Sequence, residues 1–207
     1  MATAKKPRVF AFIDSQNLNV SVQKFGWKMD WRKFRQFLEK QYGVSQAYMF
    51  IGYLPENENL YEQMHAYGYM VVLKPTFDLT RPQPDMMTPA EAAQFAKNNP
   101  AEDKKPVKGN IDAELVLWAM KEISNYDQAV IVSGDGDFYC LVEYLAGKNR
   151  LKALLAPNAH YSSLYNAYEK YVVRLDSFRS QLAYHDRFPR KRNKSGSDSG
   201  RKAPPKN

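Results

Sequence analysis

The sequence predicts one α/β domain in which a mainly parallel sheet of five to six strands is covered by helices on both faces, giving a three-layer sandwich. Short apolar runs of strand length alternate along the chain with segments of helical spacing, and this alternation is typical of parallel strands joined by crossover helices. A chain of 207 residues is long enough to bury one full hydrophobic core and is short for two.

Six apolar runs are expected to form the strands. The first covers residues 8–13 and ends at Asp14. The others cover residues 44–53, 69–73, 129–132, 151–155 and 171–175, the last of them a short one.

Helices are expected between these strands. Asp30 is typical of a helix N-cap, and apolar residues follow it at helical spacing up to Gly43, where the helix is expected to stop. Further helices are expected over residues 57–67, 110–124, 138–146 and 162–170. Gly68 and Gly147 follow two of them, and we expect Gly147 to be a left-handed helix stop.

The regular pattern breaks over residues 75–108. Six prolines in this stretch exclude a long regular element, and one short helix is expected after a capping box that begins at Thr88. Such an insertion beside a site is either a substrate lid or a passive surface excursion. We therefore divide the chain into a basic N-terminal arm (1–7), one folded domain (8–185) and a basic tail (186–207) that we expect to be disordered.

The net charge of +8 is concentrated at the two ends of the chain. Residues 1–8 carry +3 and residues 186–207 carry +6, so residues 9–185 carry −1. Basic ends on a nearly neutral body fit attraction to phosphate by flexible arms rather than binding in a broad basic groove. A solubilising tail is an equally good interpretation of the same charges.

The single cysteine, Cys140, excludes an internal disulfide and is typical of a reducing compartment. Its apolar neighbours predict a buried thiol. No apolar run approaches the roughly 18 residues that a membrane helix needs. We therefore expect a soluble, cytoplasmic protein with no membrane partner.

Four aspartates occupy corresponding positions of the predicted fold. Asp14 ends the first strand, and Asp135 and Asp137 directly follow the fourth. Asp112 begins the helix that precedes the fourth strand. Strand ends and the starts of the following helices share one edge of a right-handed parallel sheet, so we expect all four at the carboxyl edge. If the first and fourth strands are neighbours, this edge is the switch point where ligands bind.

Clustered carboxylates repel one another strongly. At ~5 Å separation and an effective dielectric constant near 20, each pair of like charges costs roughly 3 kcal/mol. Mg²⁺ or Mn²⁺ relieves this repulsion, because both ions prefer oxygen ligands and retain bound water. An ion held in this way activates water and stabilises charge that builds up on a scissile phosphate.

Three other residues are candidates for supporting this chemistry. Asn17 is suited to orient water or a phosphate oxygen, Ser133 to hydrogen-bond a carboxylate, and Lys108 to reach a non-bridging phosphate oxygen. Taken alone, each aspartate is better explained as an ordinary turn or helix-start residue. Their joint occurrence at matching positions indicates a metal site.

Three motifs together resemble the NYN domain family: FIDSQN at residues 12–17, KGNID at 108–112 and VSGDGDF at 132–138. These PIN-like nucleases include the bacterial LabA-like proteins, and the resemblance covers about residues 8–176. It implies a Rossmann-like/PIN-like sheet and cleavage of RNA. It also implies an acidic Mg²⁺ or Mn²⁺ site with the four aspartates as metal ligands, supported by Asn17 and Ser133. Two departures are the proline-rich insertion before Lys108, and Ser15-Gln16, where many relatives carry a glycine or another small residue.

We therefore expect a metal-dependent endoribonuclease with RNA as its partner, and a homodimer as the default oligomer. A phosphatase of the haloacid-dehalogenase type is one alternative, because GDGD resembles its metal-binding loop. That chemistry requires a second aspartate where this sequence has Gln16, which counts against it. The other alternative is a catalytically inactive module of the same fold that binds RNA or a protein.

Overall fold

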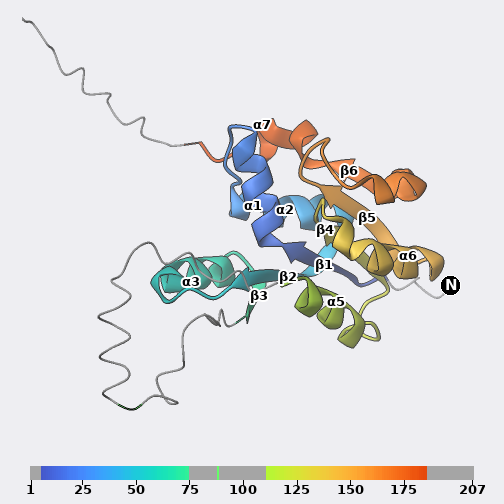
Figure 1. The fold of residues 1–207 in the computed structure, drawn as a ribbon, viewed down its shortest axis with the longest axis horizontal. Helices are drawn as coiled ribbons and strands as arrows, with labels where there is room; N and C mark the ends of the chain where they lie inside the picture. Colours follow the sequence, from blue (N-terminus) through green and yellow to red (C-terminus); the bar gives the residue numbers. More distant parts are fainter. Residues whose placement is uncertain (1–5, 75–87, 89–110, 186–207) are drawn as a thin grey trace, which may run out of the picture.

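The computed structural model describes residues 6–74, 88 and 111–185, and in this part of the chain it shows a six-stranded parallel sheet (Figure 1). The strands are β1 (Val9–Asp14), β2 (Val44–Gly52), β3 (Tyr69–Lys74), β4 (Gln128–Val132), β5 (Leu151–Ala156) and β6 (Val172–Arg174). They lie in the order β3-β2-β1-β4-β5-β6, and every neighbouring pair is parallel. The predicted fold class is thereby confirmed. Lys108, the tail and all of the insertion except Thr88 lie outside the described residues.

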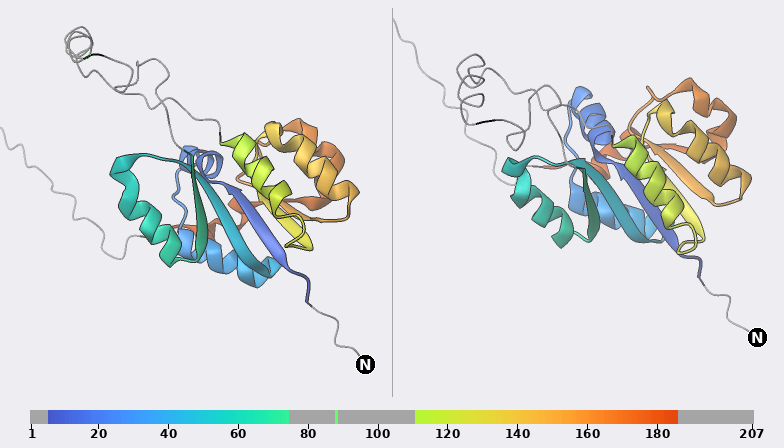
Figure 2. Two further views of the ribbon diagram at one scale, coloured as in Figure 1. Left: turned by 90° about the horizontal axis from the view of Figure 1, so that it is seen from below. Right: turned by 60° about the horizontal axis from the view of Figure 1, so that its bottom comes forward.

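Helices cover both faces of the sheet (Figure 2). On one face lie α1 (Ser15–Lys24), α2 (Trp31–Tyr42), α3 (Glu58–Ala66) and α7 (Arg179–Leu182). On the other lie α5 (Asp112–Lys121), α6 (Tyr139–Gly147) and the 3-10 segment η4 (Ser163–Tyr171). Short 3-10 turns complete the described chain: η1 (Pro55–Asn57), η3 (Gly136–Phe138) and η5 (Leu175–Phe178). None of the described helices is long and apolar enough to span a membrane.

The sheet is buried on both faces, and β1 shows why its sequence is a continuous apolar run. Successive side chains of a strand point to opposite faces. Val9, Ala11 and Ile13 therefore enter the core under α1 and α2, whereas Phe10 and Phe12 enter the core under α5 and α6. All six residues of β1 are buried, including Asp14 at its end. The apolar residues fix the register of this strand, and the register places Asp14 at the carboxyl edge.

The capping residues of α2 are those that the sequence predicts. The Asp30 carboxylate accepts a hydrogen bond of 3.1 Å from the backbone N–H of Lys33, and Gly43 ends the helix with φ +67°. Helix α1, in contrast, has no counterpart among the predicted elements. Its apolar residues Leu18, Val20 and Val22 alternate with polar residues, which is the spacing of a strand and not of a helix.

The predicted left-handed stop at Gly147 is wrong. Gly147 is the last residue of α6, and the left-handed residue is Asn149, with φ +55°. Asparagine tolerates this conformation because its short polar side chain can hydrogen-bond locally. Helix α6 ends at Gly147, one residue later than the sequence predicts. The predicted buried thiol is also wrong: Cys140 is exposed, because it lies on the outer side of α6.

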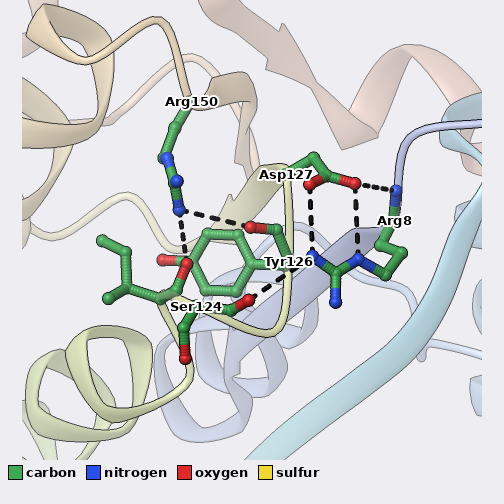
Figure 3. A network of polar contacts seen from close by, with 6 residues as sticks. Arg8, Ser124, Tyr126, Asp127 and Arg150 are labelled. Carbon is green, nitrogen blue, oxygen red and sulfur yellow. Dashed lines mark hydrogen bonds and ion pairs between the residues drawn. The ribbon is translucent and has the colours of Figure 1, made fainter.

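A polar network ties the amino edge of the sheet together (Figure 3). Asp127 accepts hydrogen bonds from the backbone N–H of Arg8 at 2.7 Å and from its guanidinium at 3.3 and 3.4 Å. Arg150 donates to the backbone carbonyls of Ile123 and Tyr126. The two arginines thus hold the loop between α5 and β4 against the starts of β1 and β5, which keeps β4 in register beside β1.

We predict that Arg150→Met lowers the free energy of unfolding by about 1–3 kcal/mol, because it leaves two partly buried carbonyl groups without their donor. Urea denaturation measures the change. Arg174→Met is the matched control, since it removes an exposed ion pair with Asp176 and is expected to cost at most about 1 kcal/mol. Equal losses for both variants would contradict the structural role given to Arg150.

Candidate active site

The carboxyl ends of β1 and β4 lie side by side at the centre of the sheet. The two strands pair in parallel, with Ile13 opposite Val132, so Asp14 stands next to the loop that begins at Ser133. From this point the chain runs to β2 on one side of β1 and to β5 on the other side of β4. The edge is therefore the topological switch point that the sequence predicts if these strands are neighbours.

A cleft of about 460 Å³ opens at this edge, and all four predicted aspartates line it. Its other lining residues come mostly from α1: Gln16, Asn17, Val20, Ser21, Lys24 and Ile111. Asp112 reaches the cleft because it is the first residue of α5, which starts beside the switch point. The structure therefore brings together Asp14, Asp112, Asp135, Asp137 and Asn17, which are separated by up to 123 positions in the sequence.

Asp14 is the buried member of the acidic group, with 4% of its surface exposed. One carboxylate oxygen accepts a hydrogen bond of 3.0 Å from the backbone N–H of Asn17, and the other accepts one of 3.2 Å from the Ser133 hydroxyl. Burial raises the pKa of Asp14 to about 6, and the nearby carboxylates of Asp112 and Asp135 add to the increase. The two hydrogen bonds act in the opposite direction, since they stabilise the ionised form.

Ser133 and Asn17 connect α1 to the loop that follows β4. The Ser133 hydroxyl donates to Asp14 and accepts from the backbone N–H of Asp135 at 3.1 Å. The side-chain oxygen of Asn17 accepts from the backbone N–H of Gly134 at 3.0 Å. Because Ser133 is fully buried, it acts on the cleft only through the carboxylate and the backbone that it bonds.

The loop from Asp135 to Asp137 is held from both sides. The Asp135 carboxylate accepts from the backbone N–H of Asp137 at 3.1 Å, and the Tyr165 hydroxyl donates to the carbonyl of Asp135. Gly136 passes so close to the start of η4 that a Cβ there would lie 2.5 Å from the Ser162 hydroxyl oxygen. Any larger residue at this position would therefore displace the side chains of Ser162 and Leu164, beside the two carboxylates that line the cleft.

The donor set suits a hard divalent cation, because carboxylate oxygens are the ligands that Mg²⁺ and Mn²⁺ prefer. Within residues 6–74, 88 and 111–185, however, no three acidic, histidine or cysteine side chains already lie close enough together to hold one ion. Asp112 and Asp135 are only partly buried and Asp137 is exposed, so an ion can reach these carboxylates from the cleft. Asp14 is the buried member of the set.

The sequence alone does not predict the α1 wall of the cleft. Val20, Ser21 and Lys24 lie on the same face of α1 as Asn17, three to four residues apart, which is the spacing of one helical face. This spacing is visible in the sequence, but it has meaning only once α1 is known to be a helix. Lys108, the cation that the sequence suggests for phosphate binding, lies outside the described residues.

Three comparisons with known proteins bear on this site. The family model of the NYN domain matches residues 8–176. The low amplitude and bright protein LabA of Synechococcus elongatus is 23% identical over 170 residues, which are 80% of this chain and 82% of that protein. A crystal structure of a protein of unknown function from Vibrio parahaemolyticus has a TM-score of 0.65 at 19% identity, and it covers 89% of this chain and 100% of that one. The structural likeness shows the fold alone.

We predict that Asp14→Asn stabilises the metal-free protein at pH 7.5 by up to about 3 kcal/mol. The folded pKa of about 6 exceeds the ordinary value of 3.8, so the folded state binds the Asp14 proton more tightly than the unfolded state does. That contribution to stability is complete below about pH 4 and is lost as the pH rises through about 6. The asparagine keeps the hydrogen bond with the backbone of Asn17 and carries no buried charge.

Urea denaturation in EDTA at pH 4 and pH 7.5 tests this prediction, with Asp176→Asn as the control. Arg174 lowers the pKa of Asp176, so replacing Asp176 by asparagine has no stabilising effect at pH 7.5. If Asp14→Asn were less stable than the wild type at pH 7.5, the buried carboxylate would not be the destabilising group that its burial indicates.

We predict that Gly136→Ala destabilises the protein by about 1–3 kcal/mol, because the new methyl group overlaps the Ser162 side chain. Gly147→Ala is the matched control, since a Cβ at that helical position meets nothing within 4 Å. The control is expected to be neutral or slightly stabilising. Thermal denaturation of both variants gives the comparison, and a Gly136 variant as stable as the Gly147 variant would exclude the close packing of the loop.

Proposed function

Because the chain belongs to the NYN domain family, which is nuclease-like, we propose that it is a metal-dependent ribonuclease that hydrolyses phosphodiester bonds within RNA. The observation that supports this proposal is the convergence of four aspartates on one cleft at the switch point of the sheet. In the proposed site, Asp14, Asp112, Asp135 and Asp137 hold Mg²⁺ or Mn²⁺. The ion supplies an activated water and neutralises charge on the scissile phosphate.

The residues of the chain have distinct parts in this proposal. Asp14 is the fixed ligand, because the backbone of Asn17 and the Ser133 hydroxyl hold both of its oxygens. Asp135 and Asp137 are ligands on the η3 turn, whose backbone is set by Tyr165 and Gly136. Asp112 closes the cleft from the α5 side.

Asn17 is the residue suited to contact the substrate directly. Its side-chain oxygen accepts a hydrogen bond from the backbone N–H of Gly134. The side-chain NH₂ group is therefore the end suited to donate to a phosphate oxygen or a water. Asn17 also lines the cleft next to Asp14. It therefore couples substrate binding to the position of the loop after β4.

A second candidate function is a catalytically inactive module that binds RNA or a protein through the same cleft. The observation in its favour is that no three of the described metal-binding side chains are already close enough to hold an ion. Membership of a family does not establish turnover, because fold and site can persist without it.

A cleavage assay separates the two candidates. We predict that the purified chain cleaves end-labelled single-stranded or structured RNA in Mn²⁺ or Mg²⁺ and not in EDTA. The double variant Asp14→Asn plus Asp135→Asn is expected to lose at least about 100-fold of this activity, which is the scale for losing a group that stabilises transition-state charge. Glu62→Gln, on the exposed side of α3, is the matched control and should cleave like the wild type.

A thermal shift with Mn²⁺ assigns the result to the site. A wild type that is stabilised by Mn²⁺, beside a double variant that is not, places the ion among the aspartates, because binding to the folded state alone raises its stability. RNA binding without cleavage, equal in the wild type and the double variant, would favour the inactive module and reject the nuclease.

A further inference from the structure

Helix α1 forms one wall of the cleft along its whole length. Gln16, Asn17, Val20, Ser21 and Lys24 all line the cleft, and their spacing places them on one face of the helix. The helix has ten residues and is therefore about 15 Å long. The cleft accordingly extends from Asp14 at the start of α1 to Lys24 at its end, well beyond the acidic group.

Lys24 is the one cation among the described residues that line this cleft. Its ammonium makes no ion pair and no hydrogen bond with the described residues, in contrast to Lys33 and Arg35 on α2, which are both engaged. The groups that shift the pKa of Asp14 do not include Lys24 either. Within the part of the chain that the structure describes, the positive charge of Lys24 therefore neither forms an ion pair nor neutralises the acidic group.

An exposed aromatic residue stands at the C-cap of α1, directly after the part of the helix that lines the cleft. Phe25 directly follows Lys24 and keeps 45% of its surface exposed, although a phenylalanine ring is strongly apolar. His160 stacks against it, with ring centroids 5.4 Å apart and planes inclined by 30°. His160 belongs to the loop after β5, and its backbone N–H donates to buried Asn158 at 2.8 Å. The ring is thus supported at the same edge of the sheet as the acidic group.

We propose that Lys24 and Phe25 form a subsite for a nucleotide of single-stranded RNA that flanks the nucleotide being cut. The Lys24 ammonium binds the phosphate of this nucleotide, and the Phe25 ring stacks on its base. The inference rests on the proposed function and deepens it, because it names the form of RNA that the cleft accepts. In a duplex the bases are already stacked on one another, and the face of a base is not free to meet Phe25.

The arrangement matches what single-stranded nucleic acids require of a protein. Proteins bind such strands by combining cations that follow the backbone with aromatic rings on which bases stack. Lys24 is about one helix length from Asp14, so it contacts a phosphate further along the strand and not the scissile one. One end of the cleft is suited to the reaction and the other to holding the strand.

Binding of a short labelled single-stranded RNA to the full chain in EDTA, followed by fluorescence anisotropy over a series of salt concentrations, tests the subsite. We predict that Lys24→Gln reduces the slope of log K against log salt by about 0.7, the value for one phosphate contact on a single strand. Phe25→Leu is expected to weaken binding by about 5- to 100-fold without changing the slope, because stacking involves no counterion. Lys40→Gln, which removes an exposed charge from α2, is the matched control.

Each outcome decides the proposal. It is overturned if Lys24→Gln changes the slope no more than Lys40→Gln does, or if Phe25→Leu binds as tightly as the wild type. It is also overturned if the wild type binds duplex RNA as well as single-stranded RNA with the same dependence on both residues. Binding that depends on Lys24 and Phe25, in a protein that cleaves no RNA with Mn²⁺, would reject the nuclease activity and leave the subsite standing.

Discussion

The buried carboxyl group of Asp14 is the constraint on which the rest of the site depends. It is the last residue of β1, the N-cap of α1 and the acceptor for the Ser133 hydroxyl after β4. Three elements therefore meet at one side chain. Any movement of α1 relative to β4 would break a hydrogen bond to this carboxyl, and Asn17 adds a second link between the same elements. The other three aspartates are placed relative to this fixed point.

Parallel topology explains how the Asp14 carboxyl, which is unfavourable as a buried charge, comes to lie at the switch point of the sheet. Adjacent parallel strands deliver their carboxyl ends to one edge, and Asp14 is carried there by a strand whose other residues fill two apolar cores. Ionising this carboxyl inside the protein is unfavourable, and Asp112 and Asp135 make it more so. Such a carboxyl is suited to a cation, since a nearby positive charge favours the ionised form that burial disfavours. In the proposed site, a metal ion beside Asp14 would therefore offset the free-energy cost of ionising this buried carboxyl.

Much of this fold and part of its site could be predicted from the sequence, and the division has a physical basis. The strands are predictable because they are buried on both faces and thus continuously apolar. Three of the aspartates are then placed by strand ends, and Asp112 by the start of α5. Helix α1 is not predictable in this way, because its apolar residues Leu18, Val20 and Val22 alternate with polar ones as they would in a strand. Without α1, the position of Lys24 in the cleft cannot be predicted either. At Gly147 the local glycine signal was misleading, because Asn149 adopts the left-handed conformation instead.

In the proposed mechanism, the charges of the cleft set the order in which the metal ion and the RNA strand bind. A polyanion that approaches the four aspartates meets four like charges, whereas the far end of the cleft offers Lys24. The body of the chain carries a net charge of −1, so in this mechanism the basic ends of the sequence supply the long-range attraction. In the proposed mechanism a strand is therefore attracted by the ends, docks at Lys24 and enters the acidic end only where a cation has reversed its charge. Metal binding then precedes productive binding of the scissile phosphate, and a strand held at Lys24 alone is bound without being cut.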